Sequence, residues 1–236
     1  MDEVRLNKYL SDAGYCSRRE ADRLIGAGRV TIDGHRAELG CKVTGRELIE
    51  VDSRPVDIKN KKVLLAYYKE RGIVCSTVNQ GGEHNSITER INYPLRIYPV
   101  GRLDKDSEGL ILMTNDGSLV NKILKGAGGH EKEYEVVVDA PLTGEAIAAM
   151  EAGGLELVEG RLSRPCVVTR TGDRSFNVIL TEGMNRQIRR MCQAFGLEVL
   201  SLKRIRFMDI GLEGLKPGEY REIDISEWIN KNGLKN

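Results

Sequence analysis

Apolar residues in this chain recur with two different periods, and the N-terminal part has the period of short helices. In residues 5–13 the apolar positions are spaced by three and four, which places them on one face of a helix. A second helix is predicted directly after Ser17, because Ser17 and Glu20 have the spacing of a capping box. Residues 29–32 then predict a strand that leads into an Asp33-Gly34 turn. The pattern therefore indicates two short helices followed by a small sheet.

A polar, proline-containing segment without periodicity, residues 52–62, predicts a linker, and beyond it the period changes to that of a sheet. Tyr134, Val136 and Val138, for example, share one strand face by alternation. The predicted strands are 63–68, 110–114, 132–138, 166–168, 176–180 and 199–207. Short helices are predicted at 86–91, 119–124, 143–150, 185–194 and 226–236, with turns at 79–82 and 126–129. We therefore expect an α+β fold, with a central, mostly antiparallel β-sheet flanked by helices after the linker.

The predicted helix 185–194 separates apolar and cationic side chains more clearly than any other. At 100° per residue one arc of the helix is apolar and can pack on a sheet. It consists of Ile188, Met191, Cys192 and Phe195. The opposite arc carries Arg186, Arg189, Arg190 and Gln193. No acid on the helix pairs with these arginines, so they are either solvated or directed at an anionic ligand or a carboxylate from elsewhere.

Charge is concentrated a second time in residues 101–110, between two glycines and ahead of an apolar run. The segment contains three acids, Asp104, Asp106 and Glu108, and two bases, Arg102 and Lys105. Such a cluster beside a buried strand is costly unless the side chains reach solvent or a cleft. It is therefore either a polar connecting loop or the carrier of a catalytic carboxylate.

Composition restricts the classes of protein. The 236 residues are 30% charged and 40% hydrophobic, with a net charge of +1, and no apolar run is long enough to span a bilayer. The N-terminus lacks the apolar region of a signal peptide, so we expect a cytoplasmic protein that does not bind membranes. The five cysteines and three histidines lack metal-ligand spacing, and we expect neither a metal nor a disulfide framework. The low net charge argues weakly against nucleic-acid binding, but residues 183–207 hold six bases and one acid.

Three N-terminal segments, residues 5–10, 16–21 and 28–34, resemble the S4 RNA-binding domain. The resemblance implies that residues 1–60 form an S4-like α/β domain with its linker. It also implies that Arg18, Arg19 and Arg23, which spacing alone leaves open between solvent and phosphate, contact RNA.

Three later motifs resemble those of the RsuA family of pseudouridine synthases, most closely its RluF-type branch that modifies large-subunit ribosomal RNA. They are Gly101-Arg102-Leu103-Asp104, Lys132-Glu133-Tyr134 and Gly183-Met184-Asn185-Arg186-Gln187-Ile188-Arg189-Arg190-Met191. The resemblance implies a catalytic domain over residues 61–236. It also implies isomerisation of uridine to pseudouridine without a cofactor: the base is flipped, its bond from N1 to ribose breaks, and C5 is joined instead.

The motifs also imply roles for individual residues. Asp104 matches the catalytic aspartate, which attacks carbon, stabilises a cationic sugar or takes a proton. Arg189 matches the arginine that pairs with this aspartate and keeps it ionised. Tyr134 matches the aromatic residue that stacks on the target uracil.

Further residues receive binding or structural roles. Leu180 would form the opposite apolar wall of the uracil pocket, and Arg102 would fill the space of the flipped base or touch a phosphate. Arg186 and Arg190 are assigned to phosphates. Asp106 and Glu108, by contrast, receive no family role and are expected to be caps or surface charges.

Other functions compete with this one. A glycoside hydrolase could use Asp104 and Glu108 as its two carboxylates, but the S4-like start and the arginine helix do not suit a neutral sugar. A non-catalytic ribosome-assembly factor could use the same fold, and a pseudouridine synthase could act on 16S ribosomal RNA or transfer RNA. We expect a monomer whose partner is ribosomal RNA, free or within a pre-ribosomal particle.

Overall fold

The computed structural model describes residues 3–56, 61–76, 85–125 and 129–234. The chain divides into two compact units, one of residues 1–63 with 93–97 and 115–117, and one of the remaining residues. Each unit is described by itself. The turns predicted at 79–82 and for most of 126–129, and the centre of the predicted linker, lie outside the described residues.

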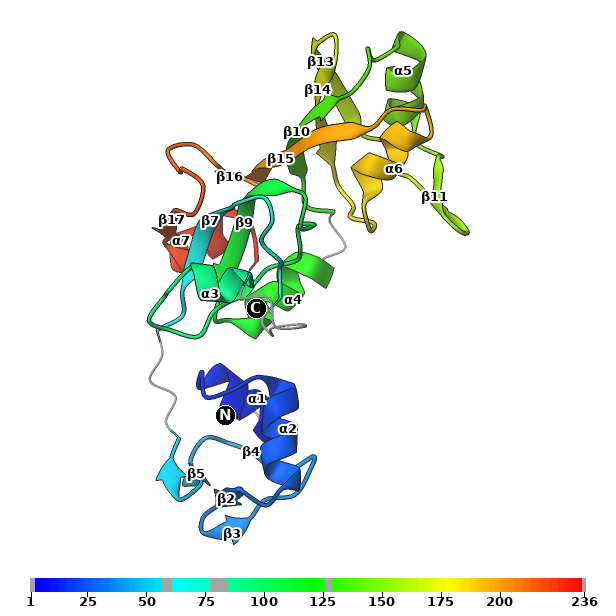
Figure 1. The fold of residues 1–236 in the computed structure, drawn as a ribbon. Helices are drawn as coiled ribbons and strands as arrows, with labels where there is room; N and C mark the ends of the chain where they lie inside the picture. Colours follow the sequence, from blue (N-terminus) through cyan, green and yellow to red (C-terminus); the bar gives the residue numbers. More distant parts are fainter. Residues whose placement is uncertain (1–2, 57–60, 77–84, 126–128, 235–236) are drawn as a thin grey trace. The chain divides into compact units, whose positions relative to one another are not determined.

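The N-terminal unit contains the two predicted helices and two small sheets (Figure 1). Its elements are β1 (Val4–Arg5), α1 (Leu6–Asp12), α2 (Arg18–Gly26), β2 (Val30–Ile32), β3 (His35–Arg36), β4 (Lys42–Val43), β5 (Ile49–Val51) and β6 (Arg54–Pro55). Ser17 accepts a hydrogen bond from the Glu20 N–H at 3.1 Å, which confirms the predicted start of α2. The prediction of a linker from residue 52 was wrong, because Asp52 and Ser53 adopt positive φ and turn the chain into the β5–β6 hairpin.

The second unit is built on one large, mostly antiparallel sheet with the strand order β13-β14-β10-β15-β9-β7-β17. Only the β9–β15 neighbours in this order are parallel. The strands of the second unit, of which β11 and β12 form a separate small sheet, are β7 (Leu64–Lys69), β8 (Tyr98–Pro99), β9 (Glu108–Thr114), β10 (Lys132–Val138), β11 (Glu156–Val158), β12 (Arg161–Leu162), β13 (Val167–Gly172), β14 (Ser175–Leu180), β15 (Val199–Phe207), β16 (Ile210–Gly211) and β17 (Tyr220–Ile223). Its helices are α3 (Ile87–Arg90), α4 (Gly117–Lys125), α5 (Gly144–Ala152), α6 (Gln187–Gln193) and α7 (Ile225–Lys231). This confirms the expected α+β class.

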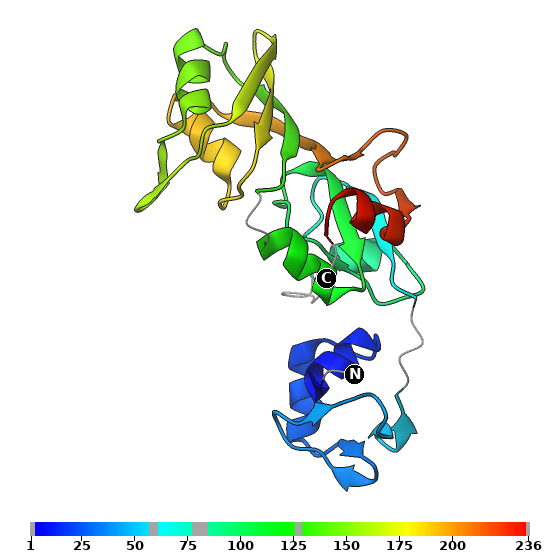
Figure 2. The same ribbon diagram turned by 180° about the vertical axis from the view of Figure 1, so that it is seen from behind.

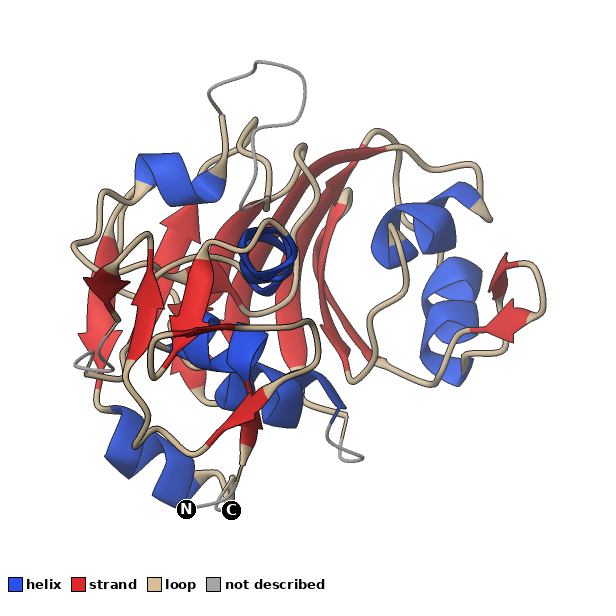
Figure 3. Cartoon of the chain, turned by 90° about the horizontal axis from the view of Figure 1, so that it is seen from below, coloured by secondary structure: helices blue, strands red, loops and turns tan. Residues whose placement is uncertain are grey.

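Two separate cores stabilise the large sheet. Helices α5 and α6 pack on the half formed by β13, β14, β10 and β15, where Phe176, Met191 and Cys192 are buried. On the other half α4 and α7 pack beside β7 and β9, where Leu112, Ile123 and Trp228 are buried. Figures 2 and 3 show the two groups of helices at opposite ends of the sheet. The predicted apolar face of the arginine helix is thus confirmed as a packing face.

Candidate active site

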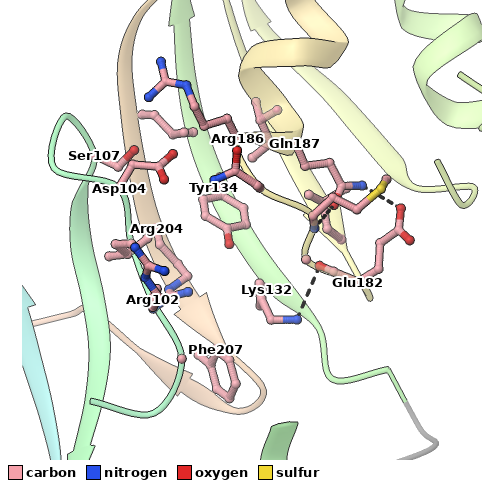
Figure 4. Close-up of a pocket in the computed structure, with 18 of the residues that line it drawn as sticks. Arg102, Asp104, Ser107, Lys132, Tyr134, Glu182, Arg186, Gln187, Arg204 and Phe207 are labelled. Atoms are coloured by element: carbon pink, nitrogen blue, oxygen red, sulfur yellow. Dashed lines mark hydrogen bonds between the residues drawn. The ribbon is translucent and has the colours of Figure 1, made fainter. Parts of the chain in front are cut away.

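A cavity of about 470 Å³ lies where the two halves of the large sheet meet (Figure 4). It is lined by the loop before β9, by β10 and β15, by the end of β14, and by the segment that leads into α6. Among the predicted site residues, Arg102, Asp104, Tyr134, Leu180 and Arg186 all line it. Residues more than 80 positions apart in sequence are therefore brought to one cavity, as the three motifs implied.

The loop that carries Asp104 is held at both ends by glycines. Gly101 has φ +81 and Gly109 has φ +103, in the region that favours glycine. Gly109 also lies against the Arg204 backbone of β15, so that an added Cβ would be 2.3 Å from the Arg204 carbonyl oxygen. The parallel pairing of Arg204 with Gly109 thus requires the glycine that follows the charge cluster. It fixes where the Asp104 loop enters the sheet.

A buried lysine also holds the Asp104 loop in place. Lys69, the last residue of β7, is fully buried, and its Nζ donates to the carbonyl oxygens of Ser107 at 2.7 Å and Glu70 at 2.9 Å. The Ser107 N–H in turn donates to the Asp104 carbonyl at 3.1 Å. Burial lowers the pKa of Lys69, while the nearby charges, those of Asp104 and Glu108 among them, oppose this shift.

A β-bulge shapes the floor of the cavity. Tyr134 of β10 pairs with Arg204 of β15, whereas Glu133 pairs with Arg206, so Ile205 has no partner in this ladder. Because the extra residue changes the alternation, Leu202, Arg204 and Phe207 all face the cavity. Tyr134 is half-buried and lies directly opposite Arg204 on the neighbouring strand.

Opposite the Asp104 loop, the cavity wall is formed by residues 182–187. Hydrogen bonds of the Gln187 side chain hold this segment in place. The Gln187 side chain accepts from the Met184 N–H at 3.0 Å and donates to the Glu182 carboxylate at 2.6 Å. Arg186 precedes α6 in the left-handed conformation, with φ 54, which is uncommon for a residue with a side chain. The helix therefore begins at Gln187 rather than at the predicted Asn185.

The arginines of α6 contact different partners from those expected. The Arg189 guanidinium donates to the carbonyl oxygens of Val199 at 3.0 Å and Asp106 at 3.2 Å. Within the described part of the chain it makes no direct ion pair with Asp104, and it is not a lining residue of the cavity. Burial, then Arg186, lowers the pKa of Arg189, and the carboxylates of Asp106 and Asp104 oppose the shift. The expected contact with Asp104 is replaced by one with the backbone two residues later.

Two other residues of this region make contacts that were not expected. Arg190 donates to the Leu157 carbonyl oxygen at 2.7 Å and does not line the cavity, so this hydrogen bond links α6 to β11, and the phosphate contact stays a prediction. Asp106, expected to have a structural role only, provides the acid that α6 lacks: its carboxylate lies 3.7 Å from Arg186. Arg186 is still half-exposed at the cavity rim.

In the N-terminal unit the three arginines of α2 are exposed. Arg23 pairs with Glu20 of the same helix at 2.6 Å, and Arg18 lies 3.5 Å from the side-chain oxygen of Asn7. Exposed guanidinium groups on one helix remain available to phosphates.

Sequence reasoning gave no site role to several residues that line the cavity, among them Ser107, Lys132, Leu202, Arg204 and Phe207. Lys132 alone had a signal, since it begins the second motif and shares the face of Tyr134. The other four depend on the bulge or on loop geometry. Over the described ranges no cluster of metal ligands occurs, and no helix there is long and apolar enough to cross a membrane.

Comparisons with known proteins agree with this architecture. The RNA pseudouridylate synthase family matches residues 63–194, and the S4 domain matches residues 4–49. The chain is 46% identical over 229 residues to the dual-specificity RNA pseudouridine synthase RluF of Salmonella typhi, covering 96% of this chain and 78% of that protein. It is 36% identical over 225 residues to the ribosomal large subunit pseudouridine synthase B of Bacillus subtilis, covering 93% of this chain and 91% of that protein. A crystal structure of a pseudouridylate synthase aligns with a TM-score of 0.68 and 28% identity, over 95% of this chain and 97% of the other.

The fold, the S4 unit and the motifs that meet at the cavity define an RNA-modifying isomerase of the pseudouridine synthase class. Within that class, the chain belongs to the RsuA-type family of RNA pseudouridine synthases.

Proposed function

We propose that this enzyme converts a uridine of 23S ribosomal RNA to pseudouridine, using residues 61–236 for catalysis and residues 1–60 for RNA binding. The name of the Bacillus subtilis relative supports large-subunit RNA as the substrate. The name of the Salmonella relative, dual-specificity, supports a test for a second kind of RNA substrate, and transfer RNA is the alternative that we would test. The reaction breaks the C1′–N1 bond and forms a C1′–C5 bond on the same nucleotide. It needs no oxidant, reductant or external group.

The observation that carries this proposal is the meeting of Asp104 and Tyr134 in one cavity of about 470 Å³. A carboxylate and an aromatic face in a single cavity suit a nucleotide whose base has left the helical stack. Tyr134 stacks on the uracil, while Asp104 acts on the sugar or the base as nucleophile, stabiliser or proton acceptor. Leu180, which is buried in the cavity wall, provides an apolar contact.

The remaining arginines have supporting roles in this proposal. Arg102 and Arg186 are exposed lining residues, so they contact phosphates or fill the gap left by the flipped base. Arg189 places a cation near Asp104 and positions its loop through the Asp106 carbonyl. We infer that the protein acts as a cytoplasmic monomer on ribosomal RNA that is free or partly assembled.

The test is a pseudouridine map of ribosomal and transfer RNA from cells that lack the gene. Wild-type protein should restore the missing mark, and folded Asp104→Asn protein should not. If a folded Asp104→Asn variant restores the mark, the catalytic role of Asp104 is wrong. If no mark is lost in the deletion strain, the chain acts as an assembly factor on this fold.

A further inference from the structure

We propose that Arg204 binds the flipped uracil and stabilises the negative charge that the base acquires when its bond to ribose breaks. This assignment rests on the proposed function, because only breaking of the C1′–N1 bond produces that charge. It gives the cavity a catalytic cation separate from the arginines of α6.

The first observation is a buried guanidinium with an unused donor. Arg204 is only 3% exposed, and its Nε donates to the Leu110 carbonyl oxygen at 2.6 Å. Its Nη2 atom is buried and has no hydrogen-bond partner, and no carboxylate among the described residues pairs with this side chain. Buried charges are normally paired, since an unpaired one loses its hydration without compensation. Because Arg204 lines the cavity, we infer that a molecule bound there provides an acceptor for its guanidinium.

A second residue of the cavity wall also has an unsatisfied polar atom. Ser107 lines the cavity, and its hydroxyl oxygen is buried and has no hydrogen-bond partner among the described residues. Two unsatisfied polar atoms in one cavity suit a flat polar base, because uracil presents two carbonyl oxygens and one N–H. An apolar ligand would leave both atoms unsatisfied.

The guanidinium is also fixed before any ligand arrives. The Leu110 carbonyl oxygen accepts a hydrogen bond from its Nε. Its central carbon lies 5.5 Å from the centre of the Phe207 ring, and the Nζ of Lys132 lies 5.7 Å from the same ring centre. The bulge at Ile205 brings Arg204 and Phe207 to the same face. A fixed donor in a buried site loses little free energy to reorganisation when charge develops beside it.

Burial distinguishes the base from the phosphates as the occupant. Arg204, Phe207 and Leu202 are buried on the cavity floor, whereas Arg102 and Arg186 are exposed at the rim. Phosphates remain part of the RNA strand and stay near the rim, while the flipped base reaches the floor. Arg204 also lies directly opposite Tyr134, on whose ring the base would stack.

A cation at this position suits the chemistry of the reaction. When the C1′–N1 bond breaks, both electrons stay with the base, which becomes a monoanion with charge on N1 and its two carbonyl oxygens. Carbon C1′ is left electron-deficient, whether Asp104 bonds to it or stabilises it. The base then turns, and C5 forms the new bond to C1′ with this electron pair; where Asp104 has bonded to C1′, that C–O bond breaks and its electrons return to the carboxylate. The C5 proton is then lost while N1 gains one. A hydrogen bond from the Arg204 guanidinium to a carbonyl oxygen is strongest at the anionic stage, so it lowers the barrier rather than only binding the substrate.

The test compares Arg204→Met and Arg204→Lys with wild type, using in vitro transcribed 23S RNA and a fragment with the uridine identified by mapping. Arg206→Gln is the matched control, because Arg206 lies on the same strand but pairs with Glu131 and Glu133 outside the cavity. At saturating RNA we expect the single-turnover rate to fall about 10²- to 10³-fold in Arg204→Met. The rate of Arg204→Lys should lie between those of Arg204→Met and wild type, and the rate of the Arg206→Gln control should stay within about threefold of wild type.

A binding measurement decides whether Arg204 contacts the flipped base or a phosphate of the RNA. With the fragment and a copy that lacks the target base, Arg204→Met or Arg204→Lys should reduce the preference for the complete fragment. If Arg204 contacts a phosphate instead, both RNAs lose affinity equally and the salt slope falls by about one, which would overturn the proposal. Thermal unfolding shows whether Arg204→Met is folded; if it is not, Arg204→Lys alone decides. An inactive wild type would refute the proposed function, whereas equal rates for folded Arg204 variants and wild type would refute only this inference.

Discussion

Helices α2 and α6 are both short and rich in arginine, yet the arginines are used differently: α2 carries three, and α6 carries two with a third, Arg186, directly before it. The arginines of α2 stay exposed, and the close partner of Arg23 is an acid on the same helix. Two of those on or beside α6, Arg189 and Arg190, donate to backbone carbonyls of distant segments.

The difference shows what decides the use of a guanidinium. A guanidinium that points to solvent can exchange water for a phosphate, so its contribution is to RNA affinity and depends on salt. A half-buried guanidinium that meets carbonyl oxygens joins segments, and here the segment carries Asp106, two residues from Asp104. Arginines on a short helix therefore support RNA binding in the N-terminal unit, on α2, and active-site geometry in the second unit, on α6.

Among the variants that test this difference between α2 and α6, we expect the largest effect on rate at Arg189. In Arg189→Gln the two carbonyls lose a charged donor, and the Asp104 loop loses its contact with α6. Because displacement of a catalytic group by about 1 Å can cost about 10²-fold, we expect the single-turnover rate to fall about 100-fold. Loss of hydrogen bonds to a charged group should lower the free energy of unfolding by about 2 kcal/mol. RNA affinity should change by less than about threefold, which a filter-binding titration measures.

Two variants control for this result. Arg189→Lys keeps the charge but has no planar fork to reach both carbonyls, so its rate should remain well below wild type. Arg190→Gln removes a similar tie, to Leu157, at a site that does not touch the Asp104 loop, and should cost stability without a comparable loss of rate. Equal loss of rate in both glutamine variants would show that α6 acts through general stability instead.

A smaller effect, on binding alone, is expected when Arg18, Arg19 and Arg23 are all changed to glutamine. Affinity for 23S RNA should fall about tenfold at physiological salt, and the salt slope should decrease by up to about two or three, one for each lost phosphate contact. The rate at saturating RNA should stay unchanged. Glutamine at Arg46 and Arg54, which are exposed elsewhere on the same unit, provides the control. An equal change of slope in that control would mean that the α2 face has no special role.

Much of the fold behind this comparison could be predicted from residue spacing. Strands β10 and β15 have the predicted bounds, and α2 begins where its capping box places it, because alternation and capping are local. The β5–β6 hairpin was missed because its turn depends on Asp52 and Ser53 adopting positive φ, for which neither residue is a strong signal.

The site was less predictable, for a different reason. The family resemblance placed Asp104, Tyr134 and Leu180 at the cavity, but it could not show that Arg189 and Arg190 would bind carbonyls. Every residue has a carbonyl oxygen, so no side-chain pattern marks these acceptors. Arg204 was counted only as one of several bases, since its orientation depends on a bulge that arises from pairing with β10.

The smallest predicted effect contrasts the two units by pH. The arginine ties of α6 keep their charge in acid, whereas a turn of the N-terminal unit depends on Glu47, whose carboxylate accepts from the Thr44 and Gly45 N–H groups at 3.0 Å each. Backbone N–H groups, first that of Glu47 itself and then that of Thr44, lower the pKa of Glu47 to about 2 from its ordinary 4.5. A carboxyl with a lowered pKa stabilises the fold above its unfolded pKa, and the stabilisation is lost as pH falls from about 4.5 toward about 2.

We therefore expect the N-terminal unit of wild type to lose thermal stability as pH falls from about 4.5 toward about 2, which NMR signals of residues 42–49 follow. Trp228 reports separately on the other unit by fluorescence. Glu47→Gln should be less stable at pH 6, and its difference from wild type should shrink as pH falls, because the neutral amide has no charge to lose. Glu38→Gln, at an exposed position of the same unit, should follow wild type. A difference between Glu47→Gln and wild type that stays constant with pH would contradict the assignment, since the effect would then come from shape rather than from charge.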